Sequence, residues 1–104
     1  MHCQFGWLVL ESSTNTHVNN NVFSANQTGV AVSASSSDNH LDNNQASGNG
    51  FQGIGVELGS TSNHINGNTA LMNGVFDLQD QNANCDDNKW NGNTFVTANQ
   101  PCIH

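Results

Sequence analysis

Residues 62–74, SNHINGNTALMNG, decide the fold of this protein because the segment recurs along the chain. Four of these residues are asparagine, a proportion that would also suit disordered filler. Related segments begin at residues 16, 39 and 88 and read THVNNNVFSANQ, NHLDNNQASGNG and NKWNGNTFVTAN. The copies are offset by 23, 24 and 25 residues. A repeat of this length predicts a solenoid, in which each copy stacks on its neighbours.

Apolar residues occupy fixed positions in every copy. One column contains Val18, Leu41, Ile65 and Trp90, and another contains Phe23, Ala46, Ala70 and Phe95. The runs GVAV, GIGVEL and GVFDL separate the copies, and GWLVL near the start resembles them. Strand alternation predicts that seven side chains of these runs face the core: Val30, Val32, Ile54, Val56, Leu58, Phe76 and Leu78.

Each period therefore holds two or three short strands, and a single period cannot bury its own apolar face. Stacking solves this problem if each period forms one rung of parallel strands, with rungs about 4.8 Å apart. Helical periodicity is absent, and glycine and asparagine recur every few residues. We predict an all-β, single-stranded parallel β-helix of about four rungs, with 23–25 residues per rung.

Two neighbouring polar columns explain the asparagines. The first contains only asparagine and glycine, at Asn20, Asn43, Gly67 and Gly92, the residue types that best tolerate a positive φ. The second is asparagine throughout, at Asn21, Asn44, Asn68 and Asn93. An inward amide has both a donor and an acceptor, so it can bond to the rungs above and below. We predict a turn column beside a structural ladder.

These rungs resemble the right-handed parallel β-helix proteins of the pectate-lyase-like superfamily, and in particular bacterial right-handed β-helix region modules. The motifs that carry the resemblance are N-x-I-x-x-N, seen at residues 63–68, and G-I-x-V, seen at residues 53–56. The resemblance implies a right-handed coil. It also identifies residues 76–103 as a closing rung, so that residues 1–84 form the rungs and residues 85–104 form a disulfide-bounded cap of the same domain.

Charge excludes two classes of partner. The chain carries one basic residue, Lys89, and a net charge of −7, so it lacks the cations that bind nucleic acid or anionic membranes. No apolar run is long enough for a membrane-spanning helix. Cys85 and Cys102 are close in sequence, and we expect them to pair in an extracellular, cell-surface or periplasmic compartment. The alternative is three free thiols in the cytosol. If Cys85 and Cys102 pair, Cys3 is left over and is either free or bridged to another chain.

Three histidines share one column, at His17, His40 and His64. Each precedes an inward apolar residue, so alternation turns it outward. Imidazoles one rung apart are close enough for two to share a divalent metal. Some β-helix proteins of this type serve copper maturation in the periplasm, which favours copper. The alternative is a solvent-facing polar column whose fourth member is Lys89.

Four carboxylates lie near the closing rung, at Asp77, Asp80, Asp86 and Asp87. Two of them on one face could bind calcium or act as an acid and base pair. The alternative is solvated acids beside the cap, because no acidic column repeats along the stack. The resemblance also favours a structural place for Asp77 and Asp80 in the closing rung. Catalytic members of the superfamily use arginine or lysine bases, or clustered aspartates, in a long groove. With one lysine, no arginine and about four rungs, this chain is expected to be non-enzymatic.

The two ends of the solenoid differ. The C-terminal end has a candidate cover in the Cys85–Cys102 segment, whereas CQFGWLVLE at the N-terminal end begins almost directly as an apolar strand. An uncapped end invites pairing with a second copy or with upstream rungs of a longer chain. We therefore expect a structural module that self-associates end to end into oligomers or filaments. The alternative is the C-terminal part of a protein that binds or processes polysaccharide.

Overall fold

The structure is a computed structural model and describes residues 8–33 and 35–104. Cys3, Gly6 and Trp7, which entered the predictions about the thiols and the N-terminal end, lie outside the described residues. The described part consists of short β-strands joined by turns, with one single-turn 3₁₀ helix, η1 (Ala83–Cys85).

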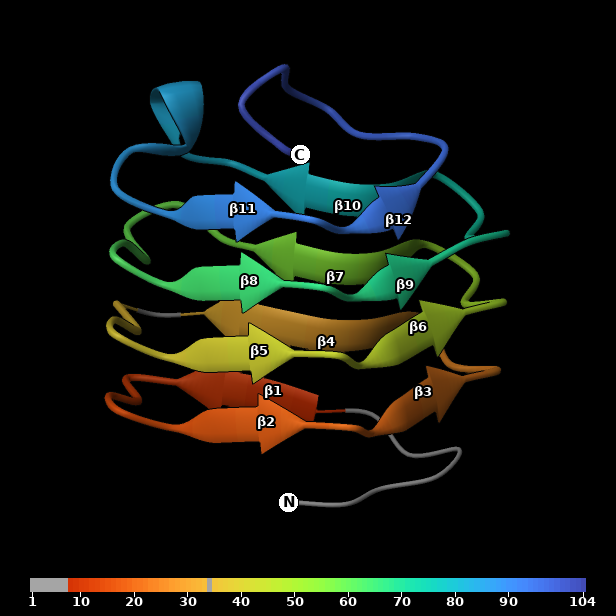
Figure 1. Ribbon diagram of the computed structural model, residues 1–104, viewed down its shortest axis with the longest axis horizontal. Helices are drawn as coiled ribbons and strands as arrows, with labels where there is room; N and C mark the ends of the chain where they lie inside the picture. Colours follow the sequence, from red (N-terminus) through yellow and green to blue (C-terminus); the bar gives the residue numbers. More distant parts are fainter. Residues whose placement is uncertain (1–7, 34) are drawn as a thin grey trace.

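The strands form three sheets, and each turn of the coil contributes one strand to each sheet (Figure 1). The first sheet contains β1 (Leu8–Glu11), β4 (Thr28–Ser33), β7 (Gln52–Val56) and β10 (Phe76–Asp80). The second contains β2 (His17–Asn19), β5 (His40–Asp42), β8 (His64–Asn66) and β11 (Lys89–Asn91). The third contains β3 (Val22–Ser24), β6 (Gln45–Ser47), β9 (Thr69–Ala70) and β12 (Thr94–Phe95).

All pairings between these strands are parallel, and the register follows the repeat. Val18 pairs with Leu41, Leu41 with Ile65, and Ile65 with Trp90, although the spacing grows along the chain. The loops absorb the extra residues, because the strands must stay in register to keep their apolar faces inward. The predicted right-handed β-helix of about four turns is confirmed.

The core lies inside the coil and consists of stacked columns. The residues expected at its centre are almost fully buried: Val18, Phe23, Val30, Val32, Leu41, Ile54, Val56, Ile65, Leu78 and Trp90. Phe95 is only half-buried because β12 is the edge strand of its sheet. Leu58, expected to face inward, is 73% exposed because β7 ends at Val56 and the chain turns there.

Phe76 also departs from the prediction. It is half-buried, and Asp77 and Leu78 behind it are buried instead. Phe76 is in register with Gln52, whereas Leu78 is in register with Ile54. The alternation expected for this run fails because Asp77 turns its carboxylate into the interior, where backbone and side-chain N–H groups bind it.

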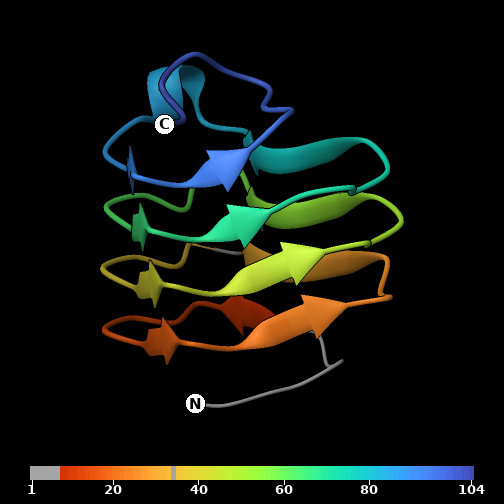
Figure 2. The same ribbon diagram turned by 45° about the vertical axis from the view of Figure 1, so that its right-hand side comes forward.

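The predicted turn column has the left-handed backbone that its composition favours. The φ angles are 58° at Asn20, 57° at Asn43, and 65° at both Gly67 and Gly92. Cys85 and Cys102 form the predicted disulfide, with their Cα atoms 6.1 Å apart. This bond ties η1 to the C-terminal segment, which folds back over the end of the stack (Figure 2).

Candidate functional site

The histidine column lies on the outer face of the second sheet. His17, His40 and His64 are the first residues of β2, β5 and β8 and are in direct register. Each is followed by a fully buried residue of the core, which fixes the imidazole on the outside. Their rings stack, with centroids 4.8 Å apart for the first pair and 4.6 Å for the second. His17 is exposed, and the other two are half-buried.

Charged and amide side chains surround this column. Lys89 of β11 is in register with His64 and occupies the fourth position of the column. Two residues along, the strands present a second outward column of Asn19, Asp42, Asn66 and Asn91. The Asn66 side-chain amide donates to the Asp42 carboxylate at 3.4 Å. One carboxylate, Asp42, and one ammonium, Lys89, therefore flank the three imidazoles.

The donor chemistry of the column fits copper, for which imidazole nitrogen is a common ligand. Within residues 8–33 and 35–104, no three histidine, cysteine, aspartate or glutamate side chains are grouped so that they could hold a metal ion. The ring planes of neighbouring histidines are nearly parallel, at 11° and 6°, so their nitrogen lone pairs do not converge as they stand. Neighbouring pairs of imidazoles, rather than a preformed three-ligand cage, are the unit that the structure supplies.

Inside the coil, the asparagines form ladders that run from rung to rung. The Asn44 side-chain amide donates to the Asn68 Oδ1 at 3.0 Å and to the Val18 carbonyl at 2.8 Å, and the Asn44 backbone N–H also donates to Asn68 Oδ1. Asn21, Asn68 and Asn93 repeat the bonds between rungs. The Oδ1 atoms of Asn44, Asn68 and Asn93 therefore each accept two bonds from the rung before.

Two further ladders were not anticipated from the sequence. One contains Asn39, Asn63 and Asn88, and the other contains Asn26, Asn49 and Asn73. The signal for the first was present, because asparagine begins three of the four aligned copies. The signal for the second was also present, because asparagine occupies the eleventh position of the first three aligned copies, at Asn26, Asn49 and Asn73.

Asp77 ends one of these ladders. Its Oδ1 accepts the backbone N–H and the side-chain amide of Asn73, and its Oδ2 accepts the backbone N–H groups of Val96 and Thr97. Burial alone raises the pKa of Asp77. The hydrogen bond from Val96, followed by those from Asn73 and Thr97, outweighs this effect and lowers the pKa from its ordinary value of 3.8.

Asp80 ends another ladder in the same way. Its Oδ1 accepts the backbone N–H and side-chain amide of Asn82, and its Oδ2 accepts the Asn88 amide at 3.1 Å and the Trp90 indole N–H at 2.9 Å. A carboxylate offers about four lone-pair positions. Four donors therefore saturate Asp80, and four saturate Asp77.

The four aspartates of the predicted carboxylate cluster are not grouped so that they could hold a metal ion. Asp77 and Asp80 are not solvated acids beside the cap, because both are buried and have no lone pair left for calcium or for proton transfer. They also terminate different ladders, while Asp86 and Asp87 are exposed beyond η1. The sequence did contain a signal: Asp77 stands in register where Gly53 stands one rung earlier, and Asp80 where Val56 stands.

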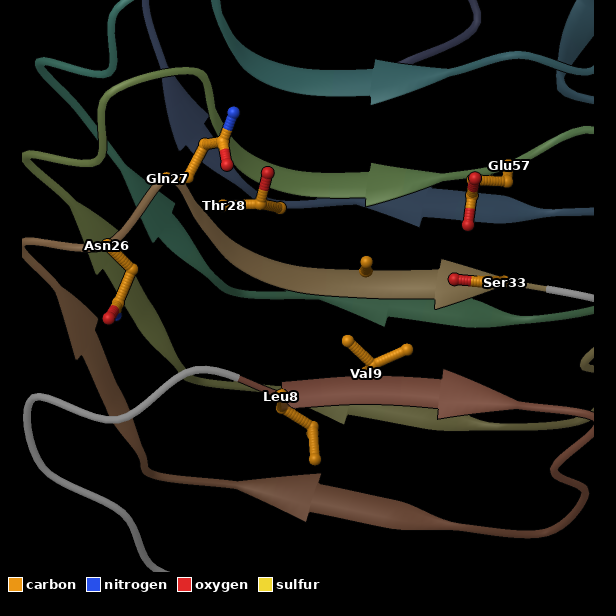
Figure 3. Close-up of a pocket in the computed structure, with 8 residues that line it drawn as sticks. Leu8, Val9, Asn26, Gln27, Thr28, Ser33 and Glu57 are labelled. Atoms are coloured by element: carbon orange, nitrogen blue, oxygen red, sulfur yellow. The ribbon is translucent and has the colours of Figure 1, made fainter.

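A shallow groove of about 460 Å³ lies on the outer face of the first sheet (Figure 3). It is lined by Leu8, Val9, Asn26, Gln27, Thr28, Ala31, Ser33 and Glu57. Gln27 and Thr28 lie toward one end and Ser33 and Glu57 toward the other, with Leu8 and Val9 below. No aromatic side chain and a single carboxylate are among these lining residues, so the binding of polysaccharide stays a prediction.

Comparison with known proteins identifies the family. The profile of the family described as "Periplasmic copper-binding protein (NosD)" matches residues 3–104, so the chain belongs to this family of β-helix proteins. Neither a curated protein nor a solved structure gives a significant match. The periplasmic family and the Cys85–Cys102 disulfide confirm a location outside the cytoplasm.

The superfamily and the absence of a membrane-spanning helix were two other predictions made from the sequence. The match does not name the pectate-lyase-like superfamily, so that resemblance stays a prediction. Among the described residues, no helix is long and apolar enough to cross a membrane.

Proposed function

We propose that this chain is a non-enzymatic, periplasmic β-helix module that binds copper on its outer surface. The observation that carries the proposal is the stacked column of His17, His40 and His64, where the fold brings three imidazoles to one exposed face. The description of the family as copper-binding supports the choice of metal.

The state of the buried polar groups supports a non-enzymatic role. Catalytic acids and bases need a free lone pair or proton directed at a substrate. Asp77 and Asp80 have all their lone pairs engaged. Among the described residues, the only buried side-chain polar atom without a hydrogen-bond partner is Gln79 Oε1, an amide oxygen with no acid or base chemistry.

Equilibrium dialysis against copper tests the proposal directly. The purified chain is dialysed against micromolar copper in the presence of millimolar magnesium and calcium, and bound metal is measured by mass spectrometry. We expect close to stoichiometric copper that neither hard cation displaces, because imidazole prefers copper over both. Copper at background level under these conditions would refute the proposal.

Assembly through the N-terminal edge is a second candidate function, and the asymmetry of the ends favours it. Residues 96–104 cover the last rung, with Ala98 bridged to Leu78 and the Thr97 carbonyl accepting from the Asp77 N–H. At the opposite side of the stack, β1, β2 and β3 are the edge strands of their sheets within residues 8–33 and 35–104. A closed C-terminal end cannot supply the second half of a head-to-tail contact, so we expect a pair of chains rather than an open filament.

Light scattering and electron microscopy on one sample test the assembly proposal. A dimer whose dissociation depends on protein concentration is the expected result. Regular filaments would contradict the inferred closure of the C-terminal end, and a monomer at every concentration would contradict self-association as a whole.

A further inference from the structure

We infer that copper is held between neighbouring imidazoles of the column, and that His40 is a member of every pair that can hold it. This inference names the residues of the copper-binding function proposed above and therefore rests on that function. It follows from three features of the column: the spacing of the rings, the chemistry of imidazole, and the residue that ends the column.

Spacing limits a single copper ion to two adjacent rings. A metal–imidazole bond is about 2.0–2.1 Å long, so two nitrogens that share one ion lie at most about 4 Å apart. The centroid distances of 4.8 Å and 4.6 Å bring adjacent rings into this range after the rings turn. His17 and His64 are two rungs apart, about 9.6 Å at the usual strand spacing, which excludes a shared ion.

The rings can turn without moving the backbone. Rotation about the Cβ–Cγ bond of histidine is a soft torsion with a broad energy profile. The column lies on the outside of the coil and no hydrogen bond of the described residues fixes its side-chain nitrogens, so the stacked rings are free to direct a nitrogen toward a neighbour. The stacking contact that is lost on metal binding is a weak one, so it does not prevent this rotation.

Imidazole chemistry makes the two pairs mutually exclusive. A neutral imidazole offers one unprotonated nitrogen, so each histidine binds one copper ion at a time. The pairs His17–His40 and His40–His64 share His40, which means that the column holds one ion in either of two overlapping positions. Lys89 ends the series because it is in register with His64 and its ammonium has no lone pair.

Single substitutions test whether His40 contributes more to copper affinity than His17 or His64. We expect His40→Asn to weaken copper binding at least tenfold in isothermal titration with copper(II) chloride, because it leaves no adjacent pair. His17→Asn and His64→Asn each leave one pair and should weaken binding about twofold, the statistical factor for losing one of two positions. His104→Asn, outside the column, is the matched control. Equal effects of all three column substitutions would overturn the inference.

Extending the column provides the sharper test. Lys89→His creates a fourth imidazole in register, so that two non-overlapping pairs can fill at once. We expect the stoichiometry to rise from one copper per chain to two, with an unchanged far-ultraviolet circular dichroism spectrum. A stoichiometry that remains at one would overturn pairwise binding.

A triple variant with His17→Asn, His40→Asn and His64→Asn distinguishes copper binding by the chain from the assignment of the copper to the histidine column. Copper bound by the native chain and lost in this variant supports both. Copper retained by the variant leaves the proposed function standing and refutes the assignment to the column. No copper bound by the native chain refutes both.

Discussion

β7 and β10 are neighbours in one sheet and in direct register, yet their interiors differ in chemistry. β7 places Gly53 and Val56 where β10 places Asp77 and Asp80. A β-carbon at Gly53 would lie 2.6 Å from the Asp77 carbonyl oxygen, so a rung with another rung above it has no room for a side chain there. At β10 the chain replaces the next full rung with the cap, and the side chain of Asp77 fits.

The difference shows how this solenoid continues and how it stops. An asparagine amide accepts bonds from one rung and donates to another, so it can be repeated without limit. The last amide of a series still has donors that require an acceptor. A carboxylate accepts only, and at Asp77 and Asp80 it ends the series without creating a new unsatisfied donor. The third ladder ends on the carbonyl oxygen of His104.

The largest expected loss of stability comes from replacing a ladder terminator, the carboxylate of Asp80 on which a series of amides ends, with the amide that forms the ladder. Asp80→Asn replaces two acceptor positions with an amide NH2, so two of its four donors lose their partner. At about 1–3 kcal/mol for each of the two buried unsatisfied groups, the free energy of unfolding should fall by about 2–6 kcal/mol. Urea denaturation measures the change. The exposed Asp87→Asn is the control, and an equal effect of both substitutions would contradict the terminator role.

The reverse exchange, a carboxylate in the middle of a ladder, should cost about 2–4 kcal/mol. In Asn44→Asp, the Val18 carbonyl loses its donor and a carboxylate oxygen faces the Asn68 Oδ1. The free energy of unfolding is again measured in urea, and the exposed Asn91→Asp is the matched control. If Asn44→Asp were as stable as the native chain, the distinction between ladder and terminator would be lost.

Reducing the cap disulfide tests how much the cap adds to the repeating rungs. The Cys85–Cys102 bond spans 17 residues, and a loop of this size is worth about 3 kcal/mol through the entropy of the unfolded chain. We expect dithiothreitol to lower the urea midpoint of the native chain. The double variant Cys85→Ala/Cys102→Ala should begin at the lower midpoint and not respond to the reductant.

Acid should weaken the cap through Asp77 by a smaller amount. The pKa of Asp77 is lowered in the folded chain, so its contribution is fully present above pH 3.8 and is lost as the pH falls through the lower folded-state value. Urea midpoints between pH 5 and pH 2 should therefore fall less steeply for Asp77→Asn than for the native chain. Asp87→Asn should keep the native slope. Identical slopes for all three chains would remove Asp77 from the acid response.

The repeat made most of the fold accessible from the sequence. The aligned columns predicted the register of the second and third sheets residue by residue, as the pairing of Val18, Leu41, Ile65 and Trp90 shows. Leu58 was misplaced because alternation was applied beyond the end of β7, and Phe76 because Asp77 and Leu78 are both buried, which breaks the alternation. The histidine column was predicted in place, because the position of an outward residue follows directly from the buried residue beside it.

The sequence by itself determined the coil, its turns with left-handed backbone and the outward histidines, because each depends on residue types that recur at one position in successive rungs. Tertiary structure alone decided what the single residues do. Asp77 and Asp80 occur once, and their role depends on where the N–H groups of Asn73, Val96, Asn88 and Trp90 converge around them. A residue type that recurs reveals the environment that the rungs share. The last rung makes contacts that no other rung makes, so the repeat does not predict them.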